Sequence, residues 1–486
     1  MVGILKAGEF EIDECIIHTS TGQEQNLLEA PYVLSNIAIE EDIEQATIFG
    51  SITFLDSGNI ASEGPIIGQE ALTLKMRTTG LKDPSAVIDF SGHSLMVFSI
   101  QANVALGETM GLTQISFCSF EMMEDRRLRI SQSFEGEYSK IVEKIFRDIL
   151  KSKKKLWLEE SVGKKKIIAP NVSPFDIVRL AMRQAVNESK EPTYYFWETT
   201  KGYHFRTLES MYAGKSELGS PLFNYIERAK PGGSYGNPKH PTMNVLGDLA
   251  SIDRWEILSG TDTLLNYQDG VYASKLIEHD IFNKTYKEFK YDYLNPKEVE
   301  QRMPATSGGG TASPMYSATP VNEKGDTIST LKEKTFLFPV SLSGKDKKRD
   351  AHHSSSSPTA ESNYIAPVAS EWHQRRVSMK HQIREGSGIG VKLFVHGNTV
   401  LNAGDMILID LMSRTLDVKK QKKFDNLYSG PFIIKKLKHT FVMASKSHTM
   451  EITAIKDSLP IELPVAGSQV LKDGPSGTIK GFYGGN

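Results

Sequence analysis

Cysteine is nearly absent from this sequence, since Cys15 and Cys118 are the only two in 486 residues. A disulfide framework needs several cysteines, and a CxxC metal or redox site needs two that lie close together in the chain. Both kinds of site are therefore excluded. We expect two buried, idle thiols.

The sequence also has little net charge and no long apolar run. The 57 Lys and Arg nearly balance the 59 Asp and Glu, so a formal charge of -2 gives no general attraction to nucleic acid or membranes. No apolar run approaches the roughly 18 residues of a membrane span. Residues 1–15 lack the apolar core and cleavage site of a signal peptide. We expect a soluble chain that is made in a cytoplasm.

Catalytic signatures are missing as well. No GxSxG elbow, HExxH, Walker loop or GxGxxG after a strand occurs, and SGGG (307–310) and GSGIG (386–390) lack the strand-to-helix context that such loops need. Carboxylates are frequent, but no local pattern marks an acid/base pair. We therefore predict no enzyme, with no catalytic, cofactor-binding or metal-binding residue and no cofactor. An enzyme stays an open alternative.

Local clusters of charge have two interpretations each. The segment EDRRLR (124–129) is either an anion site or, as we prefer, a solvated segment with internal ion pairs. Three lysine runs, at 151–155, 164–166 and 419–423, could touch phosphates. They lack interleaved aromatic residues for base stacking, which favours exposed turns. His352 and His353 have no ligand partners at zinc spacing.

What is present indicates a β-rich α+β chain of about three domains. Hydrophobic residues alternate with polar ones through much of 32–120, which is typical of an antiparallel barrel or sandwich. GEYSKIVEKIFRDILKS (136–152) and SPFDIVRLAMRQAVNES (173–189) predict helices, the second with Ser173 as N-cap. YYFWETTKGYHFRT (194–207) predicts an aromatic hairpin that turns at 199–202.

The later part of the chain alternates between strand-like and biased segments. Strand-like or mixed material is expected over 243–293 and again over 376–456. Between them, ATSGGGTASPMYSATP (305–320) and SGKDKKRDAHHSSSSPTAES (343–362) cannot bury enough apolar surface to fold, so exposed or disordered loops are expected. The Gly-rich tail from 464 is expected to be extended.

One β pattern occurs twice. FGSITFLDSGN and GQEALTLKM near residue 50 have the same order as VKLFVHGN and GDMILIDLM near residue 400. The strand pairs that follow, at 98–119 and 431–456, also match, with Ile115 and Phe117 corresponding to Ile452 and Ala454. Chance similarity of two hairpins is an alternative, but the shared order favours the duplication of a small barrel.

These segments, in their order, resemble the baseplate hub proteins of contractile-tailed bacteriophages, which are related to the first part of type VI secretion spike proteins. The resemblance rests on RRLRISQSFEGEYSKIVEKIFRDIL, SPFDIVRLAMRQA, YYFWETTKGYHFRTLESM, DGVYASKLIEHDIFNKTYKEFKYDY and VHGNTVLNAGDMILIDL with the strands after it. It covers most of 32–458. The two biased tracts and the tail lie outside it.

The resemblance implies a homotrimer with two tube-like antiparallel β-barrel domains in each subunit and an α+β domain between them. Six similar barrels would form a pseudo-sixfold layer that joins a hexameric tail tube protein to a trimeric spike protein. A channel for phage DNA, contacts with other baseplate proteins and a place in the virion tail baseplate follow from the same resemblance. The expected domains are 1–125 (first barrel), 126–225 (α+β), 226–243 (connection), 244–287 with 376–458 (second, split barrel), 288–375 (insertion with partly disordered loops) and 459–486 (tail).

Two other functions stay open. A tail-associated peptidoglycan hydrolase is the enzyme alternative. The base of a secretion-system spike is the second, although such a protein should continue into needle repeats, which do not follow residue 464.

Overall fold

The computed structural model describes residues 7–19, 21–58, 60, 66–79, 86–91, 95–108, 110–212, 223–227, 249–258, 262–280, 284–295, 303, 313–314, 325–328, 333–340, 373–384, 388–413, 425 and 427–459. Its helical segments are α2 (Phe120–Arg127), α3 (Tyr138–Lys144) with a π-helical turn (Ile145–Ile149), α4 (Pro174–Gln184), α5 (Leu208–Tyr212), α7 (Thr263–Asp269) and α9 (His373–Gln382).

Strands make up most of the described chain. The first barrel contains β1 (Phe10–His18), β2 (Glu24–Asn26), β3 (Tyr32–Asp42), β4 (Phe49–Asp56), β5 (Ala71–Thr78), β6 (Val87–Asp89), β7 (Leu95–Ala105) and β8 (Gly111–Ser119). The second contains β14 (Phe223–Glu227), β15 (Ser251–Leu258), β20 (Ile389–His396), β21 (Met406–Asp410), β22 (Gly430–Val442) and β23 (Ser447–Lys456). Smaller sheets use β9 (Ile130–Gly136), β10 (Leu156–Leu158), β11 (Lys165–Val172), β12 (Tyr194–Thr199), β13 (Gly202–Thr207), β16 (Ala273–Asp280), β17 (Thr285–Asp292), β18 (Ser313–Pro314), β19 (Lys334–Val340) and β24 (Ser458–Leu459).

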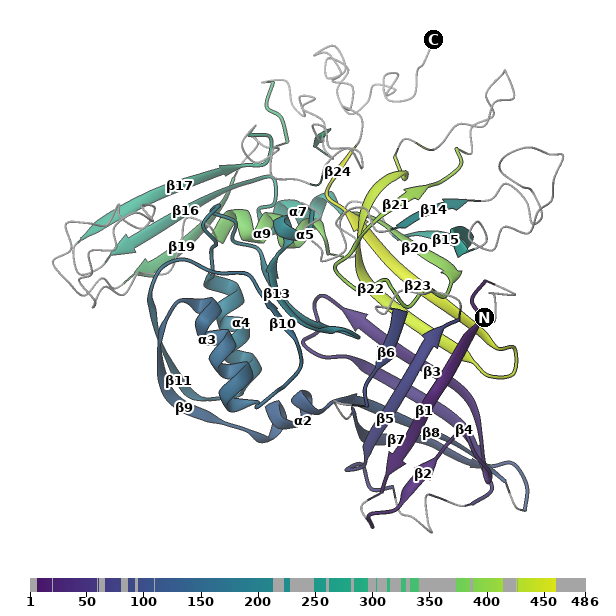
Figure 1. Ribbon diagram of the computed structural model, residues 1–486. Coiled ribbons are helices and arrows are strands. Elements are labelled where there is room, and N and C mark those ends of the chain that lie inside the picture. Colours follow the sequence, from purple (N-terminus) through teal and green to yellow (C-terminus); the bar gives the residue numbers. More distant parts are fainter. Residues whose placement is uncertain are drawn as a thin grey trace, which may run out of the picture.

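The first barrel is a curled sheet in the order β1-β5-β7-β8-β4-β3. Its alternating strands turn every second side chain inward, as β4 does with Ile52 and Phe54. Strands β1 and β3, at the two ends of this order, contribute Ile17 and Ile37 to one core. The sheet therefore encloses its apolar side chains, which places the purple strands around one another at the bottom of Figure 1.

The second barrel is a closed ring of β22-β21-β14-β15-β20-β23, because β23 pairs back onto β22. Its own core gathers inward-facing side chains such as Leu393, Ile407, Ile434 and Ile452. Strand β14 is parallel to both of its neighbours, and the other pairs in the ring are antiparallel.

The two barrels repeat one plan, as the duplicated sequence pattern predicts. The strands β1, β3, β4, β5, β7 and β8 of the first barrel correspond, in chain order, to β14, β15, β20, β21, β22 and β23 of the second. In both sets the second strand pairs with the third, the third with the sixth, the sixth with the fifth, the fifth with the fourth and the fourth with the first. Ile115 opposes Ile52 as Ile452 opposes Leu393, and Phe117 opposes Gly50 as Ala454 opposes Val391. The second strand carries a β-bulge in both barrels, at Ser35 of β3 and at Asp253 of β15. The fifth strand also carries one in both, at Phe98 of β7 and at Lys435 of β22. Two features differ: β1 is antiparallel to β5 while β14 is parallel to β21, and β7 carries a second bulge, at Gln101, that β22 lacks.

The α+β region lies beside the first barrel, at the left of Figure 1. Both expected helices are present, as α3 and α4, and they share one apolar core. Ser173 caps α4, because its hydroxyl accepts a hydrogen bond from the backbone N–H of Asp176 while the Asp176 carboxylate reaches back to the Ser173 N–H. The expected aromatic hairpin is β12–β13, with a turn of Thr200 and Lys201.

The expected limits of the second barrel are wrong in two places. Strand β14 belongs to the ring, so the chain enters this barrel by residue 223 and not at 244. Strands β16 and β17 form a separate sheet with β19, so residues 273–287 do not belong to the barrel. Strand β19 comes from within the expected insertion. The sequence pattern could not separate these strands because all of them alternate in the same way.

The predicted fold class, a β-rich α+β chain with two tube-like barrels, is confirmed. Most of the two biased tracts, and the tail from 464, lie outside the described residues. None of the helices that the structure describes is long and apolar enough to cross a membrane.

Candidate functional site: the junction between the barrels

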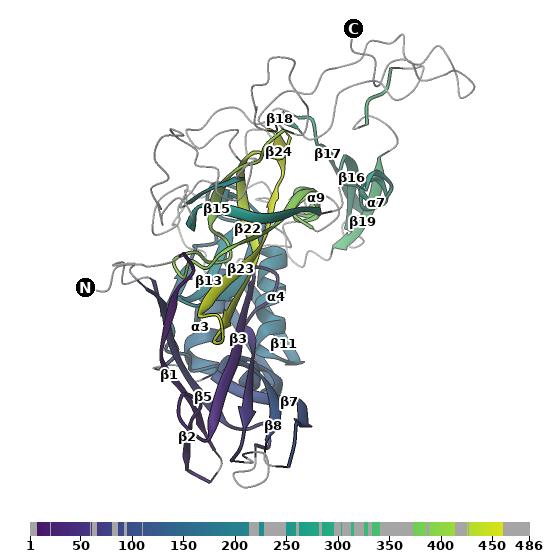
Figure 2. The same ribbon diagram turned by 90° about the vertical axis from the view of Figure 1, so that its right-hand side faces the viewer.

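The two barrels are joined edge to edge by β3 and β22. These strands pair antiparallel from Lys436 opposite Asp42 to Val442 opposite Asn36, so one sheet runs through both barrels. Figure 2 shows the yellow β22–β23 hairpin extending down beside the purple β3. Phe441 of β22 packs in the core of the first barrel, 5.1 Å from the ring centre of Phe10. The second barrel thus supplies part of the core of the first.

Ion pairs cover the outer face of this joint. The ammonium groups of Lys438 and Lys436 lie 2.8 and 3.3 Å from the Glu40 carboxylate. Burial raises the pKa of Glu40, but the hydrogen bonds and charges of the two lysines outweigh burial and hold that pKa below its usual value. Lys435 pairs with Glu44 at 2.9 Å. The two pairs of Glu40 are partly exposed to solvent and add little free energy, so they set the register more than the strength of the joint.

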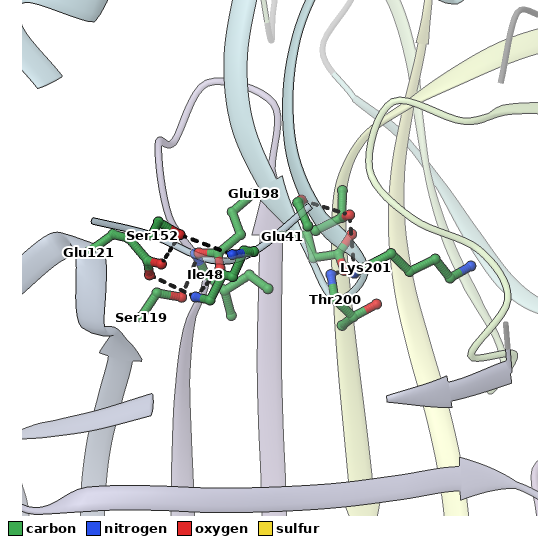
Figure 3. Close-up of polar contacts among 11 residues, drawn as sticks. Glu41, Ile48, Ser119, Glu121, Ser152, Glu198, Thr200 and Lys201 are labelled. Carbon is green, nitrogen blue, oxygen red and sulfur yellow. Dashed lines mark hydrogen bonds and ion pairs between the residues drawn. The ribbon is translucent and has the colours of Figure 1, made fainter. Parts of the chain in front are cut away.

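The aromatic hairpin closes the junction from the side. The backbone N–H of Thr200, at its tip, donates to Glu41 of β3 at 2.7 Å. The other oxygen of Glu41 accepts from the N–H of Ala403, at 2.8 Å, in the turn between β20 and β21. The Trp197 indole donates to the Ala403 carbonyl at 3.0 Å, and the Lys201 ammonium donates to the Val400 carbonyl at 2.5 Å. One buried carboxylate therefore links the first barrel, the hairpin and the second barrel (Figure 3).

The turn before β21 needs glycine at this contact. Gly404 has φ +93°, and a Cβ on it would lie 2.7 Å from Cζ2 of Trp197.

Burial raises the pKa of Glu41 to about 7, although the two N–H donors oppose this shift. Burial likewise raises the pKa of the neighbouring Asp405 to about 6.

A second buried cluster fixes the hairpin to the first barrel. The Lys154 ammonium lies 2.7 Å from Glu121 and 2.6 Å from Glu198, and all three side chains are buried. The Glu198 carboxylate also accepts from the Ile48 N–H at 2.9 Å and the Ser119 hydroxyl at 2.5 Å (Figure 3). The cluster therefore connects the loop before β4, the end of β8 and the hairpin.

Two carboxylates face one ammonium in this cluster, so full ionisation leaves one uncompensated negative charge. Burial raises the pKa of Glu198, with Glu121 adding to this and Lys154 opposing it. Burial lowers the pKa of Lys154, but the charges of Glu198 and Glu121 outweigh it and raise that pKa above its usual value. Both groups therefore hold their protons tightly, as expected where water is excluded.

The structure places several of the charged segments singled out in the sequence. Lys151, Lys153 and Lys155 are exposed as expected, but the expectation is wrong for Lys154, which the two carboxylates draw inward. In 124–129, Arg127 pairs with Glu124 at 2.5 Å, as predicted. Asp125 is instead buried and accepts from the N–H of Phe175 in α4. Lys164 and Lys166 are exposed beside and on β11.

Other candidate segments fall elsewhere. The 419–423 run, the SGGG segment and the pair His352–His353 lie outside the described residues. Within the described ranges, no group of three His, Cys, Asp or Glu side chains could hold a metal ion. Cys15 and Cys118 are buried, as expected, and burial raises the pKa of both thiols to about 12.

The sequence patterns did not predict the junction between the two barrels. One signal was available, because Glu198 is a lone acid inside the apolar run YYFWETT, and a buried acid needs partners. Glu41 gave no such signal, since its neighbours Glu40, Asp42 and Glu44 are also acidic.

Comparisons with known proteins give structural matches only. No protein-family model and no curated protein matches the chain. The 43 kDa tail protein of prophage MuSo2 from Shewanella oneidensis is similar with a TM-score of 0.45 and 10% identity, covering 92% of this chain and 100% of its own. A tail protein from Neisseria meningitidis is similar with a TM-score of 0.46 and 8% identity, covering 92% of this chain and 97% of its own. The E. coli c3393 protein, a component of the type VI secretion system, is similar with a TM-score of 0.39 and 9% identity, covering 94% of this chain and 79% of its own. All three of these structural matches have TM-scores below 0.5 and identities of 10% or less.

Proposed function

We propose that this chain is the structural baseplate hub of a contractile phage tail and has no enzymatic activity of its own. Three copies would form a ring of six barrels, which joins the hexameric tail tube protein to the trimeric spike protein. The ring would lie in the tail baseplate of the virion after synthesis in the host cytoplasm. Other baseplate proteins would contact its outer parts, and its channel would pass phage DNA.

The repeated barrel is the observation that supports this proposal best. A threefold object and a sixfold object can share a contact layer only if the layer offers six similar surfaces. One chain of this protein offers two, with the same order of strand pairing and two bulges at equivalent positions, held in one continuous sheet by β3 and β22. The buried contacts of Glu41 and Glu198 fix the hairpin against the first barrel, and Glu41 also binds the second, as a layer under mechanical load requires.

The domain division follows the same logic. The first barrel would span 1–125 and the tail 459–486, with the α+β domain ending before residue 223. The α+β domain and the β16–β17–β19 sheet lie beside the barrels in Figure 1 and would face the periphery or the spike.

The mass of the assembled protein tests this function. Purified chain, measured by sedimentation and by negative-stain imaging at low micromolar concentration, should form particles of three 54.1 kDa chains with six density lobes around a threefold axis. Another symmetry would contradict the proposal. A zymogram on cell-wall substrate separates it from the hydrolase alternative, since clearing by the purified chain would favour the enzyme.

A further inference from the structure

The first barrel and the aromatic hairpin exchange buried carboxylates. Glu198 of the hairpin accepts a hydrogen bond from the backbone N–H of Ile48, in the loop before β4, at 2.9 Å. Glu41 of β3 accepts one from the backbone N–H of Thr200, at the hairpin tip, at 2.7 Å. The two acids are 1% and 0% exposed. The hairpin is thus held at two neighbouring points by acids that water does not reach (Figure 3).

The two acids differ in what contacts their oxygens. The buried ammonium of Lys154 lies 2.6 Å from Glu198. The oxygens of Glu41 accept instead from the backbone N–H groups of Thr200 and Ala403. Backbone N–H groups favour the ionised form of a carboxyl, whereas burial favours the neutral form. Which form Glu41 takes therefore depends on how apolar its position is.

Glu41 occupies an apolar position of β3. Side chains alternate along a strand, so Glu41 lies on the same face as Ile37 and Ile39, which belong to the core of the first barrel. Ile43, just beyond the end of β3, is fully buried and packs in one cluster with Trp197 of the hairpin. An acid at the end of such a row is costly to ionise, because its charge loses the water that would solvate it.

The charged groups on the outer side of Glu41 are already balanced. The lysines of β22 pair with Glu40 and Glu44 on the outer face of the joint. Asp42, the next residue of β3, accepts from the N–H of Glu44 at 2.9 Å. His439 of β22 stays neutral, because burial lowers its pKa to about 3. These groups therefore supply no free charge to Glu41.

The charged groups on the inner side come from the hairpin and from the turn before β21. Lys201 lowers the pKa of Glu41, while Asp405 raises it. Arg206 acts on Asp405, where it opposes the effect of burial. Burial keeps His204 neutral by lowering its pKa well below the usual value. Because Lys201 and Asp405 oppose each other, burial decides the direction for Glu41.

We propose that Glu41 makes the contact between the hairpin tip and the second barrel a proton-dependent latch. The protonated acid keeps the tip closed on the turn before β21. Ionisation favours an open form in which water reaches the carboxylate, while Glu198 and Lys154 keep the hairpin on the first barrel. The latch works within a single chain, so it goes beyond the proposed function and does not depend on it.

Other contacts cross the same gap without titrating in this range. The Trp197 indole donates to the Ala403 carbonyl at 3.0 Å, and the Thr200 hydroxyl donates to the Asn402 side chain at 3.1 Å. These contacts add to the cost of opening equally at every pH. The dependence on pH therefore belongs to the acids.

The sign of this dependence follows from proton binding. Once open, Glu41 has its usual pKa of 4.5, against about 7 when it is closed. The closed form binds more protons, so its advantage is full below pH 4.5 and is lost as the pH rises through 7. The equilibrium constant for opening should rise about fortyfold between pH 5 and pH 7 and level off above that.

Hydrogen exchange of the Thr200 and Ala403 amides tests the latch, because both N–H groups donate to Glu41. The protection factor of each amide is its unprotected exchange rate divided by its measured rate at the same pH. In the purified chain this factor should fall about fortyfold from pH 5 to pH 7. Amides within β4 and β8 are the internal reference and should not fall with them.

Three variants assign the titration. Glu41→Gln removes the titrating group at almost the same size, so the protection of both amides should no longer change between pH 5 and pH 7. Glu40→Gln is the matched control, because Glu40 is the next residue on the outer face, and it should keep the full change. Asp405→Asn removes a charge that raises the pKa of Glu41, so the fall should be smaller and should end at a lower pH.

Each outcome decides the inference. A flat wild-type profile between pH 5 and pH 7 overturns the latch, whether or not the variants fold. An equal fall in the wild type and in Glu41→Gln overturns it as well, since another group then titrates. A parallel fall of the β4 and β8 amides indicates unfolding of the whole barrel and contradicts a local latch. None of these results bears on the threefold hub, which the particle symmetry tests separately.

Discussion

The Lys154 ammonium lies 2.6 Å from the Glu198 carboxylate, and both side chains are almost completely buried. The lysine comes from the loop before β10 and the acid from the aromatic hairpin, and Glu198 in turn binds Ile48 and Ser119 of the first barrel. Glu198 therefore joins four segments of the chain: its own hairpin, the loop of Lys154, and the segments of Ile48 and Ser119. Its removal should loosen the attachment of the α+β region.

Lys154→Met should be strongly destabilising. The substitution leaves Glu121 and Glu198 buried without a positive partner, and breaking a buried pair in this way typically costs about 3–5 kcal/mol. Lys153→Met is the matched control, because Lys153 is exposed and one residue away, and it should change the free energy of unfolding by less than about 0.5 kcal/mol. Urea unfolding of both variants measures this difference. Equal stability of the two would show that the pair contributes nothing.

Two buried histidines should make the protein sensitive to mild acid. His439 Nδ1 and His448 Nε2 lie 3.0 Å apart on β22 and β23, and burial lowers the pKa of His439 to about 3 and that of His448 well below its usual value. Both rings stay neutral in the folded chain but bind protons below about pH 6.5 once it unfolds. The contribution of these two histidines to stability is therefore full above pH 6.5 and is lost as the pH falls below it.

His439→Gln tests this dependence. Each such histidine should contribute a loss of about 2 kcal/mol between pH 6.5 and pH 5, at about 1.4 kcal/mol for each pH unit. The difference in unfolding free energy between pH 7 and pH 5 should shrink by that amount in the variant. An unchanged difference would show that His439 is already protonated in the folded protein.

Much of the fold could be read from the sequence because local signals agreed with the final structure. The capping box at Ser173 and the duplicated strand order are such cases. Because Ser173→Ala removes the N-cap of α4, it should lower the free energy of unfolding by about 1 kcal/mol. The ring membership of β14 and the inward turn of Lys154 were not readable. Both are decided by partners more than 40 residues away, Ile407 for β14 and Glu198 for Lys154, and periodicity reports only the local face of a strand.

Gly50 of β4 lies where the first barrel has no room for a side chain. A Cβ at this position would come within 2.2 Å of the Phe117 ring and 2.5 Å of the Ala38 carbonyl, so the aromatic ring and a backbone strand would both have to move. Gly50→Ala should therefore destabilise the chain by about 1–3 kcal/mol or more, the usual cost of overpacking a core. Gly107→Ala is the control, because nothing lies within 4 Å of a Cβ built there. Thermal unfolding should show a clear drop for the first variant and almost none for the second. A Gly50→Ala variant as stable as the wild type would mean that Phe117 can leave its place in the core at no cost.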